Sequence, residues 1–135
     1  MIRGLNHVTL AVSNLDRALV FYRDLLGLKV AAVWPTGAYL EAGQMWLCLS
    51  QDDARCAQAA QDYTHIAFDV AEADFPAMAD RVAASAVQWR ENRSEGPSLY
   101  FLDPDGHKLE LHVGSLESRL ADYRARKLPK MKLFR

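Results

Sequence analysis

The chain has 135 residues, half of them apolar, and carries a formal net charge of -1 at pH 7. This size predicts a single domain over 1–135, and the balanced charge argues against a nucleic-acid or anionic-membrane partner. No apolar run approaches the roughly 20 residues needed to cross a bilayer. Cys48 lies in a strand pattern and Cys56 in a polar stretch, so we expect reduced thiols and a cytoplasmic protein.

The first half of the chain has the pattern of a strand, a helix and three further strands. Alternating apolar residues predict a strand over 5–12, and Ser13 or Asn14 can cap the helix that follows. Apolar residues recur at helical spacing from Leu15 to Leu26, and Gly27 suits the end of that helix. The remaining strands are expected over 28–34, 38–42 and 45–50.

The second half repeats this order after a polar connector at about 51–61. Its elements are expected as a strand over 63–70, a helix over 72–85, and strands over 87–90, 98–102 and 107–113. A last helix is expected at about 115–125, with an apolar stripe formed by Leu116, Leu120 and Tyr123. We therefore predict an α+β fold of tandem βαβββ repeats, the first at about 4–50 and the second at about 62–113. Strands this short cannot close a core alone, so the repeats must pack together or against another chain.

Three polar residues interrupt the alternating apolar strands. His7 and His65 hold the same place in the two repeats, and Glu110 lies in the last strand of the second repeat. Two imidazoles and one carboxylate are a ligand set for an open divalent-metal site. A lone strand histidine is otherwise a hydrogen-bonded core residue, but the matched positions favour a metal. On the same strand, His112 is expected to be a packing or supporting residue, and His107 is expected to face solvent.

Four stretches of the chain carry a resemblance to a known family. They are residues 4–7 (GLNH), 21–27 (FYRDLLG), 92–96 (NRSEG) and 100–114 (YFLDPDGHKLELHVG). Together with the repeat, they resemble the vicinal oxygen chelate superfamily, which includes glyoxalases, extradiol dioxygenases and antibiotic-resistance proteins. Over nearly its whole length the chain is similar to the fosfomycin-resistance glutathione transferases. The resemblance implies a homodimer that exchanges its repeats and adds glutathione to fosfomycin.

The resemblance also implies a metal site formed by His7, His65 and Glu110. These residues would bind Mn2+, with Zn2+ or Fe2+ as alternatives. The first histidine would come from one subunit and the other two ligands from its partner. A loop would hold K+ as an activator, and its residues would be Asn92, Ser94, Glu95, Gly96 and Ser98.

Further residues gain roles from the same resemblance. Thr9 would contact the substrate near its epoxide, and Tyr39 would assist ionisation of the glutathione thiol. These residue types suit the chemistry, because arginines and hydroxyl donors can bind the fosfomycin dianion while a cation stabilises charge on the opening ring. The phosphonate would be bound by Arg90, Ser94, Ser98, Tyr100 and Arg119. The rest of the pocket would be lined by Trp46, Cys48 and Tyr63.

These side chains also have ordinary structural interpretations. Arg119 could be a surface charge on a helix, Ser94 and Ser98 could serve a turn, and Tyr39 could be a strand aromatic. The chain also departs from the family at Arg90, which replaces the usual lysine. This exchange puts a planar guanidinium in place of a compact ammonium group.

The sequence leaves several other functions open. Relatives that hydrolyse the epoxide use a carboxylate base near the first-half turn, where this chain has Thr36 and Gly37. Transfer of another cellular thiol, an Fe2+-dependent dioxygenase and a metal-free antibiotic-binding protein are further alternatives. The presence of all three metal ligands argues against the metal-free binding protein. The resemblance implies a Mn2+-dependent fosfomycin:glutathione S-transferase, which is the function we expect.

Overall fold

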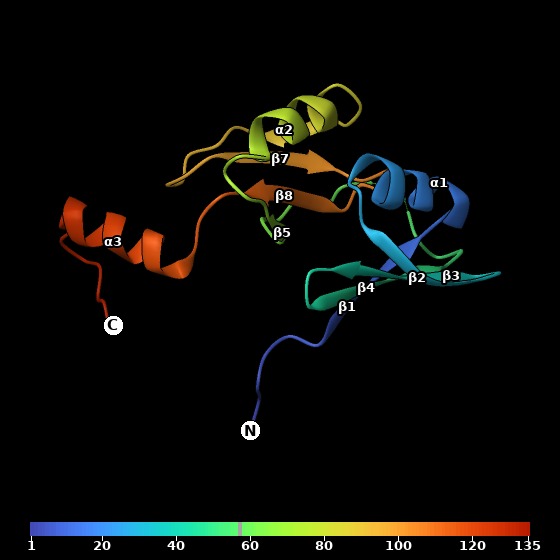
Figure 1. Ribbon diagram of the computed structural model, residues 1–135, viewed down its shortest axis with the longest axis horizontal. Helices are drawn as coiled ribbons and strands as arrows, with labels where there is room; N and C mark the ends of the chain where they lie inside the picture. The colour runs from blue at the N-terminus through green and yellow to red at the C-terminus, as the bar shows by residue number, and fades with distance from the viewer. Residues whose placement is uncertain (57) are drawn as a thin grey trace.

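The computed structural model describes residues 1–56 and 58–135, and it contains two separate four-stranded sheets (Figure 1). Ala57, in the expected connector at about 51–61, lies outside the described residues. The first sheet has the strand order β1-β4-β3-β2. Its strands are β1 (His7–Val12), β2 (Lys29–Trp34), β3 (Gly37–Ala42) and β4 (Met45–Gln51). β1 runs parallel to β4, and the other pairs are antiparallel.

The second sheet has the same topology as the first. Its order is β5-β8-β7-β6, and β5 runs parallel to β8 while the other pairs are antiparallel. Its strands are β5 (Ile66–Asp69), β6 (Gln88–Arg90), β7 (Ser98–Leu102) and β8 (Lys108–His112). The predicted α+β fold of tandem βαβββ repeats is therefore confirmed.

The first-half helix begins as predicted but then widens. The Asn14 side chain accepts a hydrogen bond of 2.9 Å from the amide of Arg17 and caps α1 (Leu15–Leu19). The chain continues directly into a π-helical segment, η1 (Val20–Leu25), and turns at Gly27 with φ of 78°. Sequence periodicity does not reveal this segment, which buries consecutive aromatic residues at positions 21 and 22.

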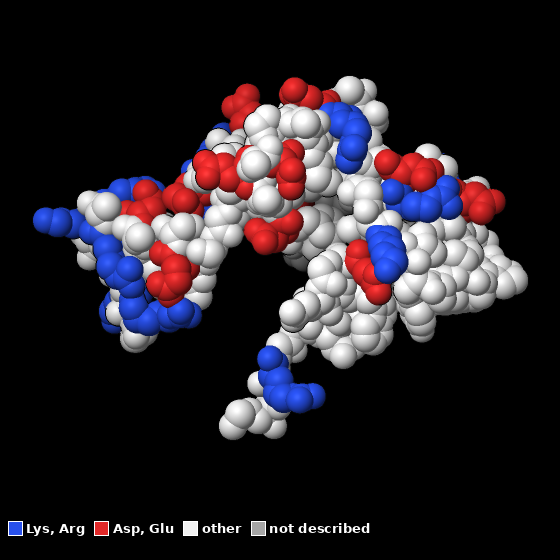
Figure 2. Space-filling view, in the orientation of Figure 1, with Lys and Arg blue, Asp and Glu red and all other residues white. Residues whose placement is uncertain are grey.

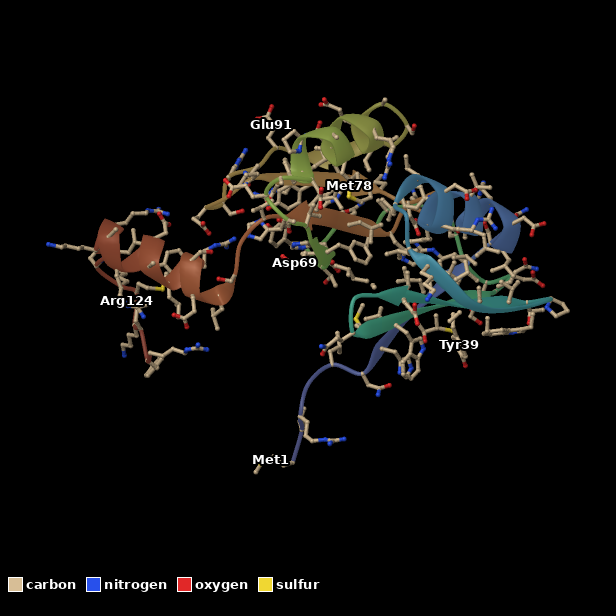
Figure 3. All side chains as sticks on the ribbon, viewed as in Figure 1. Met1, Tyr39, Asp69, Met78, Glu91 and Arg124 are labelled. Carbon is tan, nitrogen blue, oxygen red and sulfur yellow. The ribbon has the colours of Figure 1, made fainter. Side chains whose placement is uncertain are left out.

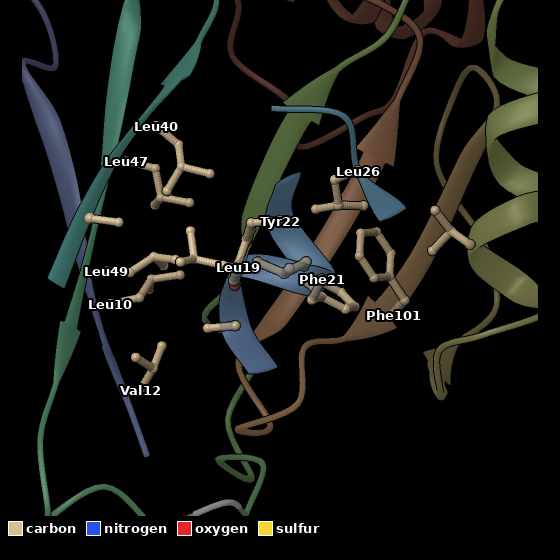
Figure 4. Close-up of a cluster of buried hydrophobic side chains, with 14 of the residues drawn as sticks. Leu10, Val12, Leu19, Phe21, Tyr22, Leu26, Leu40, Leu47, Leu49 and Phe101 are labelled. Carbon is tan, nitrogen blue, oxygen red and sulfur yellow. The ribbon is translucent and has the colours of Figure 1, made fainter. Parts of the chain in front are cut away.

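The α1–η1 helix joins both halves in one core. Leu40, Leu47 and Leu49 of the first sheet pack toward one side of it, and Phe101 of the second sheet lies on the other side (Figure 4). The rings of Phe21 and Phe101 are 6.0 Å apart. Each sheet therefore turns its apolar face toward this helix and leaves its other face open.

The other helices differ in how they pack. α2 (Phe75–Ala83) covers the second sheet, with Val82 fully buried, and starts later than predicted, with Pro76 in its first turn (Figure 1). α3 (Leu116–Arg126) extends away from both sheets, and none of its side chains is buried. Within its apolar stripe, Leu116 is exposed while Leu120 and Tyr123 are half-buried, so the described chain covers the stripe only in part. Among the described residues, no helix has the length and apolar character to cross a membrane.

The turn before β8 fastens the second half to the first through buried polar groups. The hydroxyl of Tyr22 donates a 2.6 Å hydrogen bond to Oδ2 of Asp103. The other oxygen of Asp103 accepts from the amides of Asp105 and His107, and Asp105 accepts from the amide of Ser13. Asp103 and Asp105 are 5% and 0% exposed, so these bonds replace lost hydration.

His107 is part of the same junction. Its Nε2 donates a 2.7 Å hydrogen bond to the carbonyl of Ala11 in β1. The prediction that His107 faces solvent was therefore wrong. The turn folds back on β1, a neighbour that is remote in sequence and has no local signature.

We expect Tyr22→Phe to lower the free energy of unfolding at pH 7 by about 1.5–3 kcal/mol, because a buried carboxylate loses its donor. Burial, reinforced by the charge of Asp103, raises the pKa of Tyr22 well above its usual value. Above pH of about 10 the unfolded phenol ionises while the folded one stays protonated, so wild-type stability falls as pH rises. Tyr22→Phe should lose this part of the pH dependence, because it has no phenol at this position to ionise. Urea unfolding at pH 7 and between about pH 9 and 11 measures both effects.

Tyr39→Phe is the control for this comparison, because Tyr39 is 42% exposed. It should change the unfolding free energy by less than about 0.5 kcal/mol. Equal stability of Tyr22→Phe and wild type at pH 7 would contradict the proposed contribution of the buried bond.

Candidate metal and substrate site

The open face of the second sheet gathers a set of polar side chains, here called the second-half cluster: His65, Ser98, Tyr100, Glu110 and His112. Strand register places them together, because Tyr100 pairs with Glu110 and Ser98 pairs with His112 across β7 and β8. Side chains of such pairs lie on the same face of a sheet. His65 lies one residue before β5, not within a strand as predicted.

A hydrogen bond to the backbone orients the His65 ring. Its Nδ1 lies 2.8 Å from the carbonyl oxygen of Tyr63, and a carbonyl can only accept. The neutral ring therefore carries its proton on Nδ1 and a lone pair on Nε2. That Nε2 lies 3.0 Å from Oε2 of Glu110. Two electron-rich atoms at this distance need a proton or a metal cation between them.

Glu110 is nearly enclosed but still reaches the open face. Glu110 is only 5% exposed, and its Oε1 accepts a 2.7 Å hydrogen bond from the Ser98 hydroxyl. A buried carboxylate is costly unless it is paired, and a metal-ligating carboxylate is usually oriented by a further hydrogen bond. The donor set of His65 and Glu110 therefore fits two positions of a divalent-metal site.

An arginine and hydroxyl groups lie beside this pair. The Arg90 guanidinium lies 4.5 Å from the ring centre of Tyr63 and 5.3 Å from that of Tyr100. The hydroxyls of Ser94 and Tyr100 are 3.2 Å apart. Burial raises the pKa of Tyr100, so its hydroxyl remains a donor at neutral pH. A surface pocket of about 470 Å³ adjoins them, with Arg90, Tyr63 and Arg93 in its lining.

The loop between β6 and β7 is closed by its own side chains. The Asn92 amide donates to the carbonyl of Gly96 at 2.8 Å, and the Ser94 amide and hydroxyl donate to Asn92 Oδ1. Gly96 has φ of 82°, and a Cβ there would collide with the carbonyl of Val113. Glu95 forms a 3.5 Å ion pair with Arg119 of α3. The loop therefore connects the open face of the second sheet to the last helix.

The open face of the first sheet carries the other predicted residues, here called the first-half face: His7, Thr9, Tyr39, Trp46 and Cys48. Register pairs His7 with Trp46, and it pairs Cys48 with both Thr9 and Tyr39. Figure 3 shows Tyr39 below the sheet, on the side away from α1, and Figure 2 shows mainly uncharged surface over β3 and β4.

Two neighbours hold the ring of His7. It stacks on Trp46 with ring centres 4.5 Å apart and an angle of 8°. Its Nδ1 lies 2.6 Å from Oδ1 of Asn6, so the proton on Nδ1 leaves Nε2 with a free lone pair. His7 is exposed at this edge of the sheet. Its free nitrogen is therefore available to a metal or to another chain.

The chain does not bring all three predicted ligands together. His7 lies on the first sheet, while His65 and Glu110 lie on the open face of the second. Among the described residues, no three histidine, cysteine or acidic side chains form a group that could hold a metal. The convergence of the three ligands thus stays a prediction about an assembly of chains.

The structure also shows supporting residues that sequence reasoning missed. Trp89 packs against Tyr100 at 5.2 Å and His65 at 5.6 Å, and its indole donates to the carbonyl of Leu109. Asn6 orients His7. Asn6 was detectable only as the polar neighbour of a candidate ligand, and nothing in the short 87–90 pattern marked Trp89.

Two known proteins similar to this chain are both named as thiol transferases. It is 56% identical over 124 residues to the glutathione transferase FosA of Serratia marcescens, covering 90% of this chain and 88% of that protein. It is 40% identical to the metallothiol transferase FosB of Staphylococcus haemolyticus, covering 94% and 95% of the two chains.

Solved structures of fosfomycin resistance proteins have the same fold. FosX of Mesorhizobium loti matches with a TM-score of 0.74 and 32% identity, covering 89% of this chain and 99% of the other. FosX of Listeria monocytogenes, bound to Mn(II) and 1S,2S-dihydroxypropylphosphonic acid, matches with a TM-score of 0.73 and 27% identity over 90% and 99% of the chains.

Residues 4–111 match the family model described as the Glyoxalase/Bleomycin resistance protein/Dioxygenase superfamily. The matched segment includes both repeats and the candidate ligands His7, His65 and Glu110. The chain therefore belongs to the glyoxalase/bleomycin resistance protein/dioxygenase superfamily.

Proposed function

We propose that this protein is a metal-dependent glutathione transferase that inactivates fosfomycin by adding the thiol to its epoxide. The observation that carries the proposal is the 3.0 Å approach of the His65 Nε2 lone pair to a buried Glu110 oxygen, beside an arginine and two hydroxyls. This arrangement suits a cation together with an oxyanion ligand. Identity of 56% to a glutathione transferase supports glutathione as the thiol.

His65 and Glu110, with His7 of a second copy, would hold the divalent cation. Mn2+ is our choice because a FosX relative binds Mn(II), while Zn2+ and Fe2+ also suit two imidazoles and a carboxylate. When bound, the metal would act as a Lewis acid for the charge that grows on the epoxide oxygen.

The remaining groups would bind and orient the two substrates. Arg90, Tyr100 and Ser94 present one positive charge and two hydroxyls for the phosphonate, and Arg119 and Ser98 lie at the edge of this group. Because Arg90 stacks on aromatic rings, its planar group is held in place where a lysine would be more mobile.

The thiol chemistry would involve the first-half face. The glutathione sulfur would form a bond to an epoxide carbon as the carbon–oxygen bond breaks, and the oxygen would finally take up a proton. Tyr39 is exposed on this face and would donate a hydrogen bond to the glutathione sulfur, which favours the thiolate as the thiol proton passes to solvent, while Thr9 would lie near the epoxide. Trp46, Cys48 and Tyr63 would line the pocket. The 92–98 loop would hold K+.

A homodimer would complete the site. The two open faces belong to different sheets of one chain, and the α1–η1 helix holds the opposite faces of those sheets. A two-fold partner could place its first-half face over the second-half cluster, so that two complete sites would form per dimer. The cytoplasm is the expected location because glutathione and free Cys48 and Cys56 suit a reducing compartment.

Adding Mn2+ to metal-free protein should raise its melting temperature. At a free Mn2+ concentration of 100 Kd, binding would add about 2.7 kcal/mol to the free energy of unfolding, a shift of several degrees. Glu110→Gln should abolish most of this shift, because the amide removes the anionic ligand. Differential scanning calorimetry with Mn2+ and with Mg2+ measures the effect. An equal shift in both proteins would rule out Glu110 as a ligand.

Incubation with fosfomycin, glutathione, Mn2+ and K+ should give the glutathione–fosfomycin adduct. Glu110→Ala should reduce the rate by at least about 100-fold, because the ligand is lost and His65 is left without its anionic partner. Mass spectrometry of the product identifies the reaction. A diol would indicate hydrolysis, unchanged drug would indicate sequestration, and full activity without a divalent ion would contradict the mechanism.

Mixing two inactive variants tests whether sites form between chains. His7→Ala and Glu110→Ala proteins should each be inactive, but exchanged dimers would contain one intact site. Random exchange should restore about a quarter of wild-type activity, because half of the dimers are mixed and each has one of two sites complete. Assays after joint refolding provide the measurement. No recovery, despite mixed dimers detected by native mass spectrometry, would show that sites do not form across subunits.

A further inference from the structure

A line of hydrogen bonds joins α3 to the carboxylate of Glu110. The Arg119 guanidinium lies 3.4 Å from Nε2 of His112, and Nδ1 of His112 lies 2.6 Å from the hydroxyl of Ser98. The same hydroxyl lies 2.7 Å from Oε1 of Glu110. His112 is therefore the only link in this line that contacts both the helix arginine and the serine.

The donor and the acceptor of each hydrogen bond in this line can be assigned. Glu110 accepts, so the one hydrogen of the Ser98 hydroxyl points to it, and the hydroxyl oxygen must accept from His112 Nδ1. The proton of the neutral imidazole is then on Nδ1. Its Nε2 is left as an acceptor, and the Arg119 guanidinium can only donate to it. The His112 tautomer with its proton on Nδ1 is consistent with all three contacts.

The ring of His112 is fixed by its surroundings as well as by these bonds. A Cβ at Gly114 would lie 2.7 Å from His112 Nε2, and a Cβ at Gly96 would lie 3.3 Å from its Cε1. The two glycines thus leave room for the imidazole, whose side chain is 16% exposed. On the far side, Glu95 pairs with Arg119 at 3.5 Å. The arginine is consequently held between an acceptor ring and a carboxylate.

We propose that His112 is a positioning residue that orients Glu110 through Ser98 and Arg119 through its other ring nitrogen. The proposal rests on the proposed function, in which Glu110 binds metal and Arg119 binds the phosphonate. In this role His112 would bind neither the metal nor the phosphonate, although its Nδ1 also lies 3.5 Å from Oε1 of Glu110. It sets the relative position of the two groups that do, and so couples metal binding in the sheet to substrate binding by α3.

Two substitutions test the two hydrogen bonds of His112 separately. His112→Asn places an amide donor where Nδ1 was and removes the acceptor for Arg119, whereas His112→Gln reaches the Nε2 position and removes the donor to Ser98. We expect His112→Gln to weaken Mn2+ binding by about 10- to 100-fold, the usual effect of losing a bond behind a ligand. We expect His112→Asn to keep Mn2+ affinity within about threefold but raise the fosfomycin KM about fivefold.

The metal measurement does not depend on turnover. Titration of metal-free protein with Mn2+, followed by electron paramagnetic resonance of the free ion, gives Kd for wild type and both variants. His107→Asn is the matched control, because it removes another histidine hydrogen bond of 2.7 Å, made to β1 and not to the second-half cluster. It should lower the melting temperature while leaving the Mn2+ Kd within about twofold. If all three variants lost Mn2+ affinity equally, in proportion to their loss of stability, a positioning role for His112 would be overturned.

A nuclear magnetic resonance measurement tests the hydrogen-bond line without metal or substrate. Long-range proton–nitrogen correlations of His112 in metal-free protein should show the proton on Nδ1 and a lone pair on Nε2. The opposite tautomer would overturn the inference whatever the enzyme does. If wild type binds Mn2+ and forms adduct but the variants do not split as expected, the inference alone fails. If wild type neither binds Mn2+ nor forms adduct, the proposed function fails. The tautomer of His112 would still show whether the hydrogen bonds to Ser98 and Arg119 are formed as inferred.

Discussion

The site depends on one short approach between two electron-rich atoms, Nε2 of His65 and Oε2 of Glu110. The backbone carbonyl of Tyr63 holds the ring proton on the far nitrogen, so the near nitrogen has only a lone pair to offer. Burial makes the carboxylate expensive unless a positive charge neutralises it. Two further groups lie on this face of the second sheet: the Ser98 hydroxyl donates to Glu110, and the Arg90 guanidinium lies over the rings of Tyr63 and Tyr100.

The duplicated fold gives one chain the two open faces that the proposed shared site requires. Each repeat forms a sheet with an apolar face and an open polar face, and the α1–η1 helix lies against both apolar faces. The open faces carrying His7 and Glu110 therefore remain available for a second chain. The partly covered stripe of α3 fits the same interpretation, since a helix with no buried side chain and a 57% exposed Leu116 has unused apolar surface.

Polar contacts between distant segments also join the two halves of the chain. The Tyr22–Asp103 bond and the His107–Ala11 bond fix the last hairpin against the first half, and β8 of that hairpin carries Glu110. The closed 92–96 loop and its Glu95–Arg119 pair place α3 beside the same strand. The chain is similar to FosA and FosX over about nine-tenths of its length.

Periodicity along the sequence was sufficient for the two repeats and most strand positions, and it singled out His7 and Glu110 as polar residues within strands, whereas His65 lies just before its strand. These features are local, because strand alternation and turn residues act over a few positions. The π-helical segment, the hydrogen bond from His107 to β1 and the Arg119–His112–Ser98–Glu110 line were decided only by tertiary structure. They depend on which distant groups meet when the sheets pack. A histidine's neighbours, and hence the nitrogen that carries its proton, have no signature along the chain.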